Sequence, residues 1–300
     1  MTAFTLGVNT CFAVKRWPEP EEWARVVAED FGLKDVQFTF DLLDPRAGAG
    51  AVAAYVDHVR VACERRGISI HSTFTGFIPF SQNLLLHPEP TFREDAKEWF
   101  KAAIDVTARM NVAQFGGYFG SLTVKEVENQ ALRDERMQQW LDAIRELAAY
   151  AKEKGLEALM VEHMAGWREP PTGIGEALVL ADLKTAVPVR IAIDLGHMVV
   201  KGRAGDDLDP YAWLRKVSPK AGCIHLQQSN SRYDLHQAFT AEANKEGRID
   251  PKKAVEAIKA SGAEKAVLMF EIMHASEEDE KKVIDDIRGS VELWRAALKG

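Results

Sequence analysis

Eight short apolar segments, each followed by a longer stretch of helical periodicity, constrain the fold of this 300-residue chain more than any other feature. We predict that these segments are strands; they are Phe4–Asn9, Val36–Phe40, Ile68–Phe74, Val112–Phe115, Leu156–Glu162, Val189–Asp194, Gly222–Gln227 and Ala266–Glu271. Eight β–α units in a chain of this length predict one α/β domain over residues 1–300, a single (β/α)8 TIM barrel.

Several helical stretches end in a glycine or asparagine directly before the next apolar segment, as expected of helix C-caps. The predicted caps are Gly32, Gly67, Asn111, Gly155 and Gly262. A doubly wound sheet is the alternative fold. It would usually carry a glycine-rich turn after its first strand, where this chain has "NTCFAVKRW". We therefore favour the barrel.

Composition limits the partners. The chain is 46% hydrophobic and has a formal net charge of −7, so its acidic surface disfavours a nucleic-acid partner. Its three cysteines form no CxxC pair, which argues against a disulfide framework or a structural zinc site. The first residues lack a signal-peptide pattern, and no stretch of about 18 apolar residues occurs. We expect a cytoplasmic enzyme that does not bind membranes.

Polar residues close the last four predicted strands. These are Glu162, Asp194 and Glu271, together with His225 inside "GCIHLQ". Catalytic side chains of a TIM barrel lie at the carboxyl ends of the strands, where they converge on the axis. Period-two alternation turns Glu162 and Glu271 toward the same inner face as the apolar residues before them. A carboxylate at such a position is costly to bury unless it is paired, protonated or bound to a cation.

Three carboxylates and one imidazole form a hard, oxygen-rich ligand set. Such a set suits Mn²⁺ best, with Mg²⁺, Co²⁺ and Zn²⁺ as alternatives. We therefore predict one divalent metal ion per chain, bound by Glu162, Asp194, His225 and Glu271. A buried ion-pair network without a metal is the structural alternative.

The motifs "VEH" (161–163), "IDLGH" (193–197), "IHLQQS" (224–229) and "FE" (270–271) resemble those of the xylose isomerase-like barrels. The resemblance is to the sugar (phosphate) isomerase/epimerase branch, which includes ketose 3-epimerases, and it covers nearly the whole chain. It implies that the four residues above hold the metal, that Glu162 and Glu271 also act as acid and base, and that His197 binds substrate. It further implies proton transfer through a metal-stabilised enediolate, with a small sugar or sugar phosphate as substrate and a dimer or tetramer as the assembly.

Three further residues are candidates for substrate binding. Arg232 has a planar guanidinium suited to a phosphate, and His236 follows it on the same loop. His71 lies near the end of the third predicted strand. The irregular, aromatic segment 75–90 is long enough to form a lid over the substrate. Segment 72–90 and the "DLHQAFT" stretch resemble tetrulose-phosphate epimerases or isomerases.

Other functions share this scaffold. An inosose-type dehydratase would use the same metal and base to expel a hydroxyl, and a sugar-binding barrel without activity would lack one of the two glutamates. An apurinic endonuclease, a hydrolase, would need extra metal ligands. Asp234 and His236, with His71, resemble some of them, but Gln114 stands where that enzyme has a histidine. The two glutamates favour an epimerase and leave an aldose–ketose isomerase open.

Overall fold

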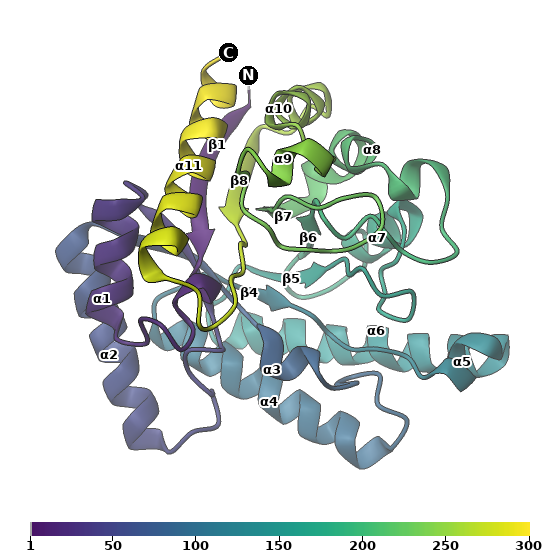
Figure 1. Ribbon diagram of the computed structural model, residues 1–300. Coiled ribbons are helices and arrows are strands. Elements are labelled where there is room, and N and C mark those ends of the chain that lie inside the picture. Colours follow the sequence, from purple (N-terminus) through teal and green to yellow (C-terminus); the bar gives the residue numbers. More distant parts are fainter. Residues whose placement is uncertain (1) are drawn as a thin grey trace.

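The computed structural model describes residues 2–300, and in it eight parallel strands form a closed barrel surrounded by helices (Figure 1). The strands are β1 (Ala3–Asn9), β2 (Asp35–Thr39), β3 (Ser69–Phe74), β4 (Gln114–Gly117), β5 (Ala158–Glu162), β6 (Val189–Asp194), β7 (Ala221–Leu226) and β8 (Lys265–Phe270). Each pairs in parallel with the next, and β8 pairs with β1 to close the ring. The predicted (β/α)8 TIM barrel is confirmed.

The helices alternate with the strands and pack on the outside of the barrel (Figure 1). They are α1 (Pro20–Arg25), α2 (Ala49–Arg66), α3 (Phe77–Phe80), α4 (Pro90–Arg109), α5 (Val124–Glu128), α6 (Gln130–Glu153), α7 (Ile174–Ala181), α8 (Pro210–Val217), α9 (Ala243–Glu246), α10 (Pro251–Ala260) and α11 (Glu280–Lys299). A π-helical turn, η2 (Val26–Asp30), continues α1, and short 3-10 turns are η1 (Thr10–Ala13), η3 (Gly205–Leu208) and η4 (Ser218–Lys220). Among residues 2–300, no helix is long and apolar enough to cross a membrane.

The helix caps explain why three predicted strands begin too early. Gly67, Asn111 and Gly155 adopt left-handed backbone conformations, with φ of 63°, 59° and 86°. The apolar residue that follows each cap donates its N–H back into the helix; these bonds run from Ile68 to Cys63, from Val112 to Thr107 and from Leu156 to Ala151. This is the Schellman pattern, so these apolar residues end a helix and do not open a strand. Gly32 and Gly262 also have positive φ, as predicted.

The long helices bury one stripe against the barrel. In α6, Trp140, Ile144, Leu147 and Ala151 recur at helical spacing and are all buried. Because i, i+4, i+7 and i+11 lie on one face of a helix, this spacing holds α6 against the strands beside it. The packed layer between the strands and the helices holds the strands in place and so fixes the positions of the residues at their carboxyl ends.

Inside the barrel, a separate apolar cluster fills the space below the carboxyl end; it consists of Phe74, Met160, Ala192, Cys223 and Met269. Met160 fits because β4 and β7 each have a glycine facing it: a Cβ on Gly116 or Gly222 would lie 2.5 Å from its side chain. The interior is therefore packed and dry below any polar group at the barrel's end.

Candidate metal centre and active site

Four polar side chains converge at the carboxyl end of the barrel. Glu162 and Asp194 are the last residues of β5 and β6, and His225 lies one residue before the end of β7. Glu271 follows β8 and continues its pairing, since its N–H donates to the carbonyl of Leu226 at 3.1 Å. Potential ligand atoms of the four residues all lie within 4.8 Å of one another. We call this group the carboxylate–histidine cluster.

The imidazole of His225 stands at the centre of the carboxylate–histidine cluster. Its Nδ1 lies 3.1 Å from Oε1 of Glu162, 3.0 Å from Oε2 of Glu271 and 3.8 Å from Oδ2 of Asp194. The ring of Phe74 packs edge-on against it, with 4.9 Å between ring centroids. All four side chains of the cluster are buried. Charges brought together in such a buried site interact more strongly than they would in water.

The donor set fits a divalent cation. Oδ2 of Asp194 is buried and has no hydrogen-bond partner among residues 2–300, although an unpaired carboxylate oxygen is costly to bury. Burial also raises the pKa of Glu162 and of Asp194, because it penalises the charged form of each carboxylate. A cation among these oxygens would satisfy both requirements. The cluster is therefore consistent with a divalent metal site.

Hydrogen bonds to the other carboxylate oxygen hold Asp194 so that its Oδ2 faces the cluster. Its Oδ1 accepts hydrogen bonds from the N–H of Gly196 (2.6 Å) and from Nε2 of Gln227 (2.9 Å). A Cβ on Gly196 would lie 2.4 Å from the Gln227 side chain, so the glycine of "IDLGH" is required for this close approach. Gln227 in turn accepts the backbone N–H of His236 at 2.6 Å. These contacts connect Asp194 to the loop that follows β7.

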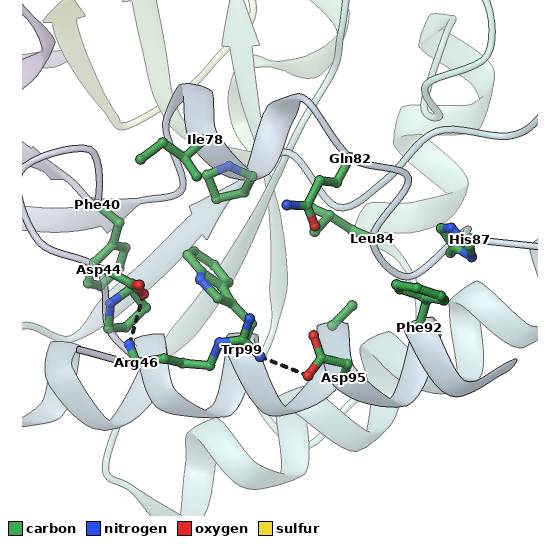
Figure 2. Close-up of a pocket in the computed structure, with 13 residues that line it drawn as sticks. Phe40, Asp44, Arg46, Ile78, Gln82, Leu84, His87, Phe92, Asp95 and Trp99 are labelled. Atoms are coloured by element: carbon green, nitrogen blue, oxygen red, sulfur yellow. Dashed lines mark hydrogen bonds and ion pairs between the residues drawn. The ribbon is translucent and has the colours of Figure 1, made fainter. Parts of the chain in front are cut away.

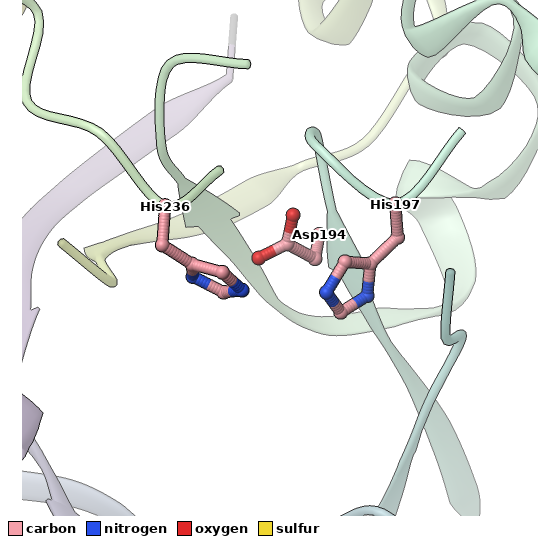
Figure 3. Close-up of side chains that lie close together, drawn as sticks. All are labelled: Asp194, His197 and His236. Carbon is pink, nitrogen blue, oxygen red and sulfur yellow. The ribbon is translucent and has the colours of Figure 1, made fainter. Parts of the chain in front are cut away.

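Two further histidines flank Asp194 (Figure 3). Nδ1 of His197 lies 2.7 Å from the carbonyl of His163, and the Nε2 atoms of His197 and His236 lie 3.3 and 3.2 Å from Oδ2 of Asp234. Burial lowers the pKa of both imidazoles, but the carboxylates of Asp234 and Asp194 outweigh it and raise the pKa of His236 to about 9 and that of His197 well above its usual value. The carboxylate of Asp234 thus stabilises the charged form of both imidazoles.

A cavity of about 280 Å³ opens from the cluster to the mouth of the barrel. Glu162, Glu271, His197 and His236 line it on the polar side. The remaining lining residues are mostly apolar or small and include Phe74, Phe77, Phe80, Tyr118, Met164 and Met273. No lysine or arginine is among the residues that line this cavity. Its size suits a small polyhydroxylated molecule, which would have polar side chains on one side and apolar side chains on the other.

The lid segment predicted from sequence, residues 75–90, contains α3 and covers one side of this cavity. Phe77 and Phe80 line the cavity beside the cluster, while Ile78 lines a second one of about 150 Å³ that reaches Trp99 and Phe92 on α4 (Figure 2). The carboxylate of Asp41 accepts the N–H of Phe77 and of Ile78, at 2.9 and 3.2 Å. These two hydrogen bonds anchor the first turn of α3 to the loop after β2.

The structure separates two of the predicted substrate contacts from the cavity. His71 is the third residue of β3, so it lies near the amino end of the barrel, where it lines another cavity with Gln114 and Arg190. His71 does not line the cavity beside Glu162, so its expected contact with substrate gains no support and stays a prediction. Arg232 is exposed and does not line the cavity, but it stands two residues before Asp234, which does.

Sequence reasoning missed polar residues on the opposite wall of the barrel. Asn9 and Gln37 are almost fully buried on β1 and β2, and both reach the cluster by hydrogen bonds. A signal was present: Gln37 stands between Val36 and Phe38, and alternation places it on the inner face while its neighbours face the helices. Asp41, which holds the lid segment, follows β2 and gave no such signal.

Comparison with known proteins agrees with this geometry. The model of a family described as xylose isomerase-like TIM barrel matches residues 26–295. The chain belongs to this family. It is 31% identical over 298 residues to D-erythrulose 1-phosphate 3-epimerase from Brucella abortus (strain 2308), covering 97% of this chain and 96% of that protein.

Two solved structures superimpose over almost the entire chain. A protein from Rhodospirillum rubrum ATCC 11170 is 32% identical, with a TM-score of 0.90 over 98% of this chain and 99% of its own. D-Psicose 3-epimerase from Clostridium cellulolyticum H10, solved with D-tagatose, has a TM-score of 0.73 over 98% and 99% of the two chains. Its identity is 16%, so it supports the fold alone. Family and curated relative together indicate a sugar epimerase or isomerase.

Proposed function

We propose that this chain is a metal-dependent 3-epimerase of a four-carbon ketose phosphate. The observation that carries the proposal is the placement of two glutamates on separate strands around one centre. Glu162 and Glu271 lie 3.1 and 3.0 Å from the same nitrogen of His225, and both line the cavity. Epimerisation needs a proton acceptor and a proton donor on opposite faces of one carbon, and this arrangement supplies both.

The glutamates carry the proton in this proposal. One carboxylate removes the proton from the carbon beside the ketone, and the other carboxyl group returns a proton to the opposite face. For the reverse epimer the two residues exchange roles. His197 and His236 hold the substrate hydroxyls at the wall of the cavity, and the apolar interior below them excludes water.

Glu162, Asp194, His225 and Glu271 would hold one divalent ion, and we propose Mn²⁺ because three of the four ligands are carboxylates. When bound, it supplies positive charge next to the oxygen on which negative charge develops as the proton leaves.

The 31% identity to a D-erythrulose 1-phosphate 3-epimerase supports a phosphorylated tetrulose as the substrate. The cavity wall itself provides no lysine or arginine for the phosphate. We assign that contact to Arg232, whose side chain is exposed. Arg232 stands two residues before Asp234, which lines the cavity, and we propose that it contacts a phosphate projecting from the cavity.

Proton NMR in D₂O tests the proposal. Purified, Mn²⁺-loaded protein is incubated with D-erythrulose 1-phosphate, L-erythrulose 1-phosphate and the two free erythruloses. We expect the signal of the C3 proton to disappear from the phosphates and the opposite enantiomer to accumulate. An aldose formed from either free erythrulose would indicate an isomerase, and a dehydrated product a lyase. Retention of the C3 proton in all four sugars would refute the proposal.

A further inference from the structure

Two buried amides, Asn9 on β1 and Gln37 on β2, lie beside the cluster on the wall opposite β5 and β6. Neither lines the cavity, and both are about 1% exposed or less. They therefore touch neither substrate nor solvent. A buried amide must have hydrogen-bond partners, and each of these two has one partner in the cluster itself.

Gln37 determines which nitrogen of His225 carries the proton. Its Oε1 lies 2.7 Å from Nε2 of His225, while its own Nε2 lies 3.1 Å from Oγ of Ser72. Oε1 is an acceptor only, so Nε2 of His225 must be the donor. In a neutral imidazole the lone pair is then on Nδ1, the atom that faces the three carboxylates.

Asn9 connects that contact to one of the glutamates. Its Nδ2 donates one hydrogen to Oε1 of Gln37 at 2.8 Å and the other to Oε1 of Glu271 at 3.0 Å. The Oδ1 atom of Asn9 accepts the backbone N–H of Cys11 at 2.8 Å, which fixes the orientation of the amide. With Oε1 of Glu271 engaged, Oε2 is the oxygen left to face Nδ1 of His225.

We propose that Asn9 and Gln37 form a positioning pair, which holds His225 in the metal-binding tautomer and presents Oε2 of Glu271 to the metal and the substrate. Hydrogen-bond partners behind a metal ligand commonly contribute 10- to 100-fold to metal affinity or activity. The part that concerns Glu271 rests on its proposed role in proton transfer. The part that concerns His225 needs only that the cluster binds a cation.

Equilibrium dialysis of Mn²⁺ against the purified, full-length protein tests the role of Gln37 without reference to any sugar. Gln37→Leu removes the acceptor for His225, and we expect its Kd for Mn²⁺ to rise roughly 10- to 100-fold. Gln37→Glu retains an acceptor at that position, and we expect it to bind Mn²⁺ within about threefold of the unaltered protein. The matched control is Gln228→Leu, which removes a buried amide that contacts Asn244 and Ile249 and no member of the cluster.

The Asn9→Leu variant tests the role of Asn9 at saturating Mn²⁺. Because Asn9 does not line the cavity, we expect kcat for epimerisation to fall roughly 10-fold or more while KM stays within about twofold. Equal Mn²⁺ affinity in Gln37→Leu and in unaltered protein, or an equal loss in Gln228→Leu, would overturn the proposal for Gln37. A proportional rise in KM with unchanged kcat in Asn9→Leu would overturn it for Asn9. If no sugar is epimerised, the proposed function fails, and the Mn²⁺ measurements still decide the role of Gln37.

Discussion

Glu162 and Glu271 share a functional group but differ in their surroundings. Burial raises the pKa of Glu162. Burial has the same tendency at Glu271, but the imidazole of His225 outweighs it and lowers the pKa to about 2. The amide of Asn9 also donates to Glu271. Two carboxyl groups with different proton affinities, both facing one cavity, are what an acid–base pair requires.

Replacing either glutamate by glutamine removes a proton carrier and preserves its shape. We expect Glu271→Gln and Glu162→Gln to lower the rate of solvent-deuterium exchange into substrate by at least about 100-fold, the usual contribution of one acid–base group. Proton NMR measures the exchange, and circular dichroism checks the fold. Glu264→Gln is the control, because Glu264 is an exposed carboxylate at the opposite end of the barrel. Unaltered exchange in Glu271→Gln would contradict its role.

His236 makes the stability of the metal-free protein depend on pH. Its pKa is raised to about 9 in the folded protein, against about 6.5 in an unfolded chain. The charged form is therefore favoured by folding; its contribution is complete below pH 6.5 and is lost as pH rises toward 9. In EDTA, we expect the Tm of the unaltered protein to fall over this range and that of His236→Gln to fall less. Parallel Tm curves for the two proteins would contradict this assignment.

At the scale of elements, the short helix α3 depends on a residue outside the lid segment. Asp41 accepts two N–H groups at its start, and its position is compatible only with glycine at residue 76, which has φ of 90° and where a Cβ would lie 2.4 Å from the Asp41 carboxylate. The aromatic residues of α3 that line the cavity are thus positioned by the loop after β2.

The Asp41→Ala variant should loosen the lid segment. Loss of such a cap costs about 1 kcal/mol locally, so we expect faster proteolysis within residues 75–90 and a several-fold higher KM. Limited proteolysis with mass spectrometry and steady-state kinetics measure the two effects. The control is Asp44→Ala, which removes a carboxylate from the same loop that accepts only the N–H of Arg46. If both variants show the same cleavage and KM, Asp41 does not hold the lid segment.

At the scale of the whole molecule, the closed ring of strands lets a single ion link residues from four strands. A ligand that binds the folded state alone stabilises it, by about 2.7 kcal/mol at a concentration of 100 times Kd. We therefore expect Mn²⁺ to raise the Tm of EDTA-treated protein by roughly 4–8 °C. Differential scanning calorimetry measures the shift, and elemental analysis should find one ion per chain. Identical Tm values with Mn²⁺ and with EDTA would contradict a metal at the cluster.

Much of the barrel was predictable because its signals are local. The caps Gly67, Asn111 and Gly155 and the apolar segments after them are readable within a few residues. Three strands were predicted to begin too early because the apolar residues there end helices. Two candidate residues show what a local pattern cannot predict. His71 and Glu162 both lie on barrel strands, but His71 lines a cavity at the amino end of the barrel and Glu162 lines the cavity at the carboxyl end.

The sequence by itself determined the repeated β–α pattern and the four polar residues at the ends of the last strands, because both follow from periodicity and strand order. Only the tertiary structure decided which atoms meet. It placed Asn9 and Gln37, more than 180 residues from His225 and Glu271 in the chain, within hydrogen-bond distance of them. Such contacts depend on how a barrel closes and on side-chain direction, and no pattern within one segment carries that information.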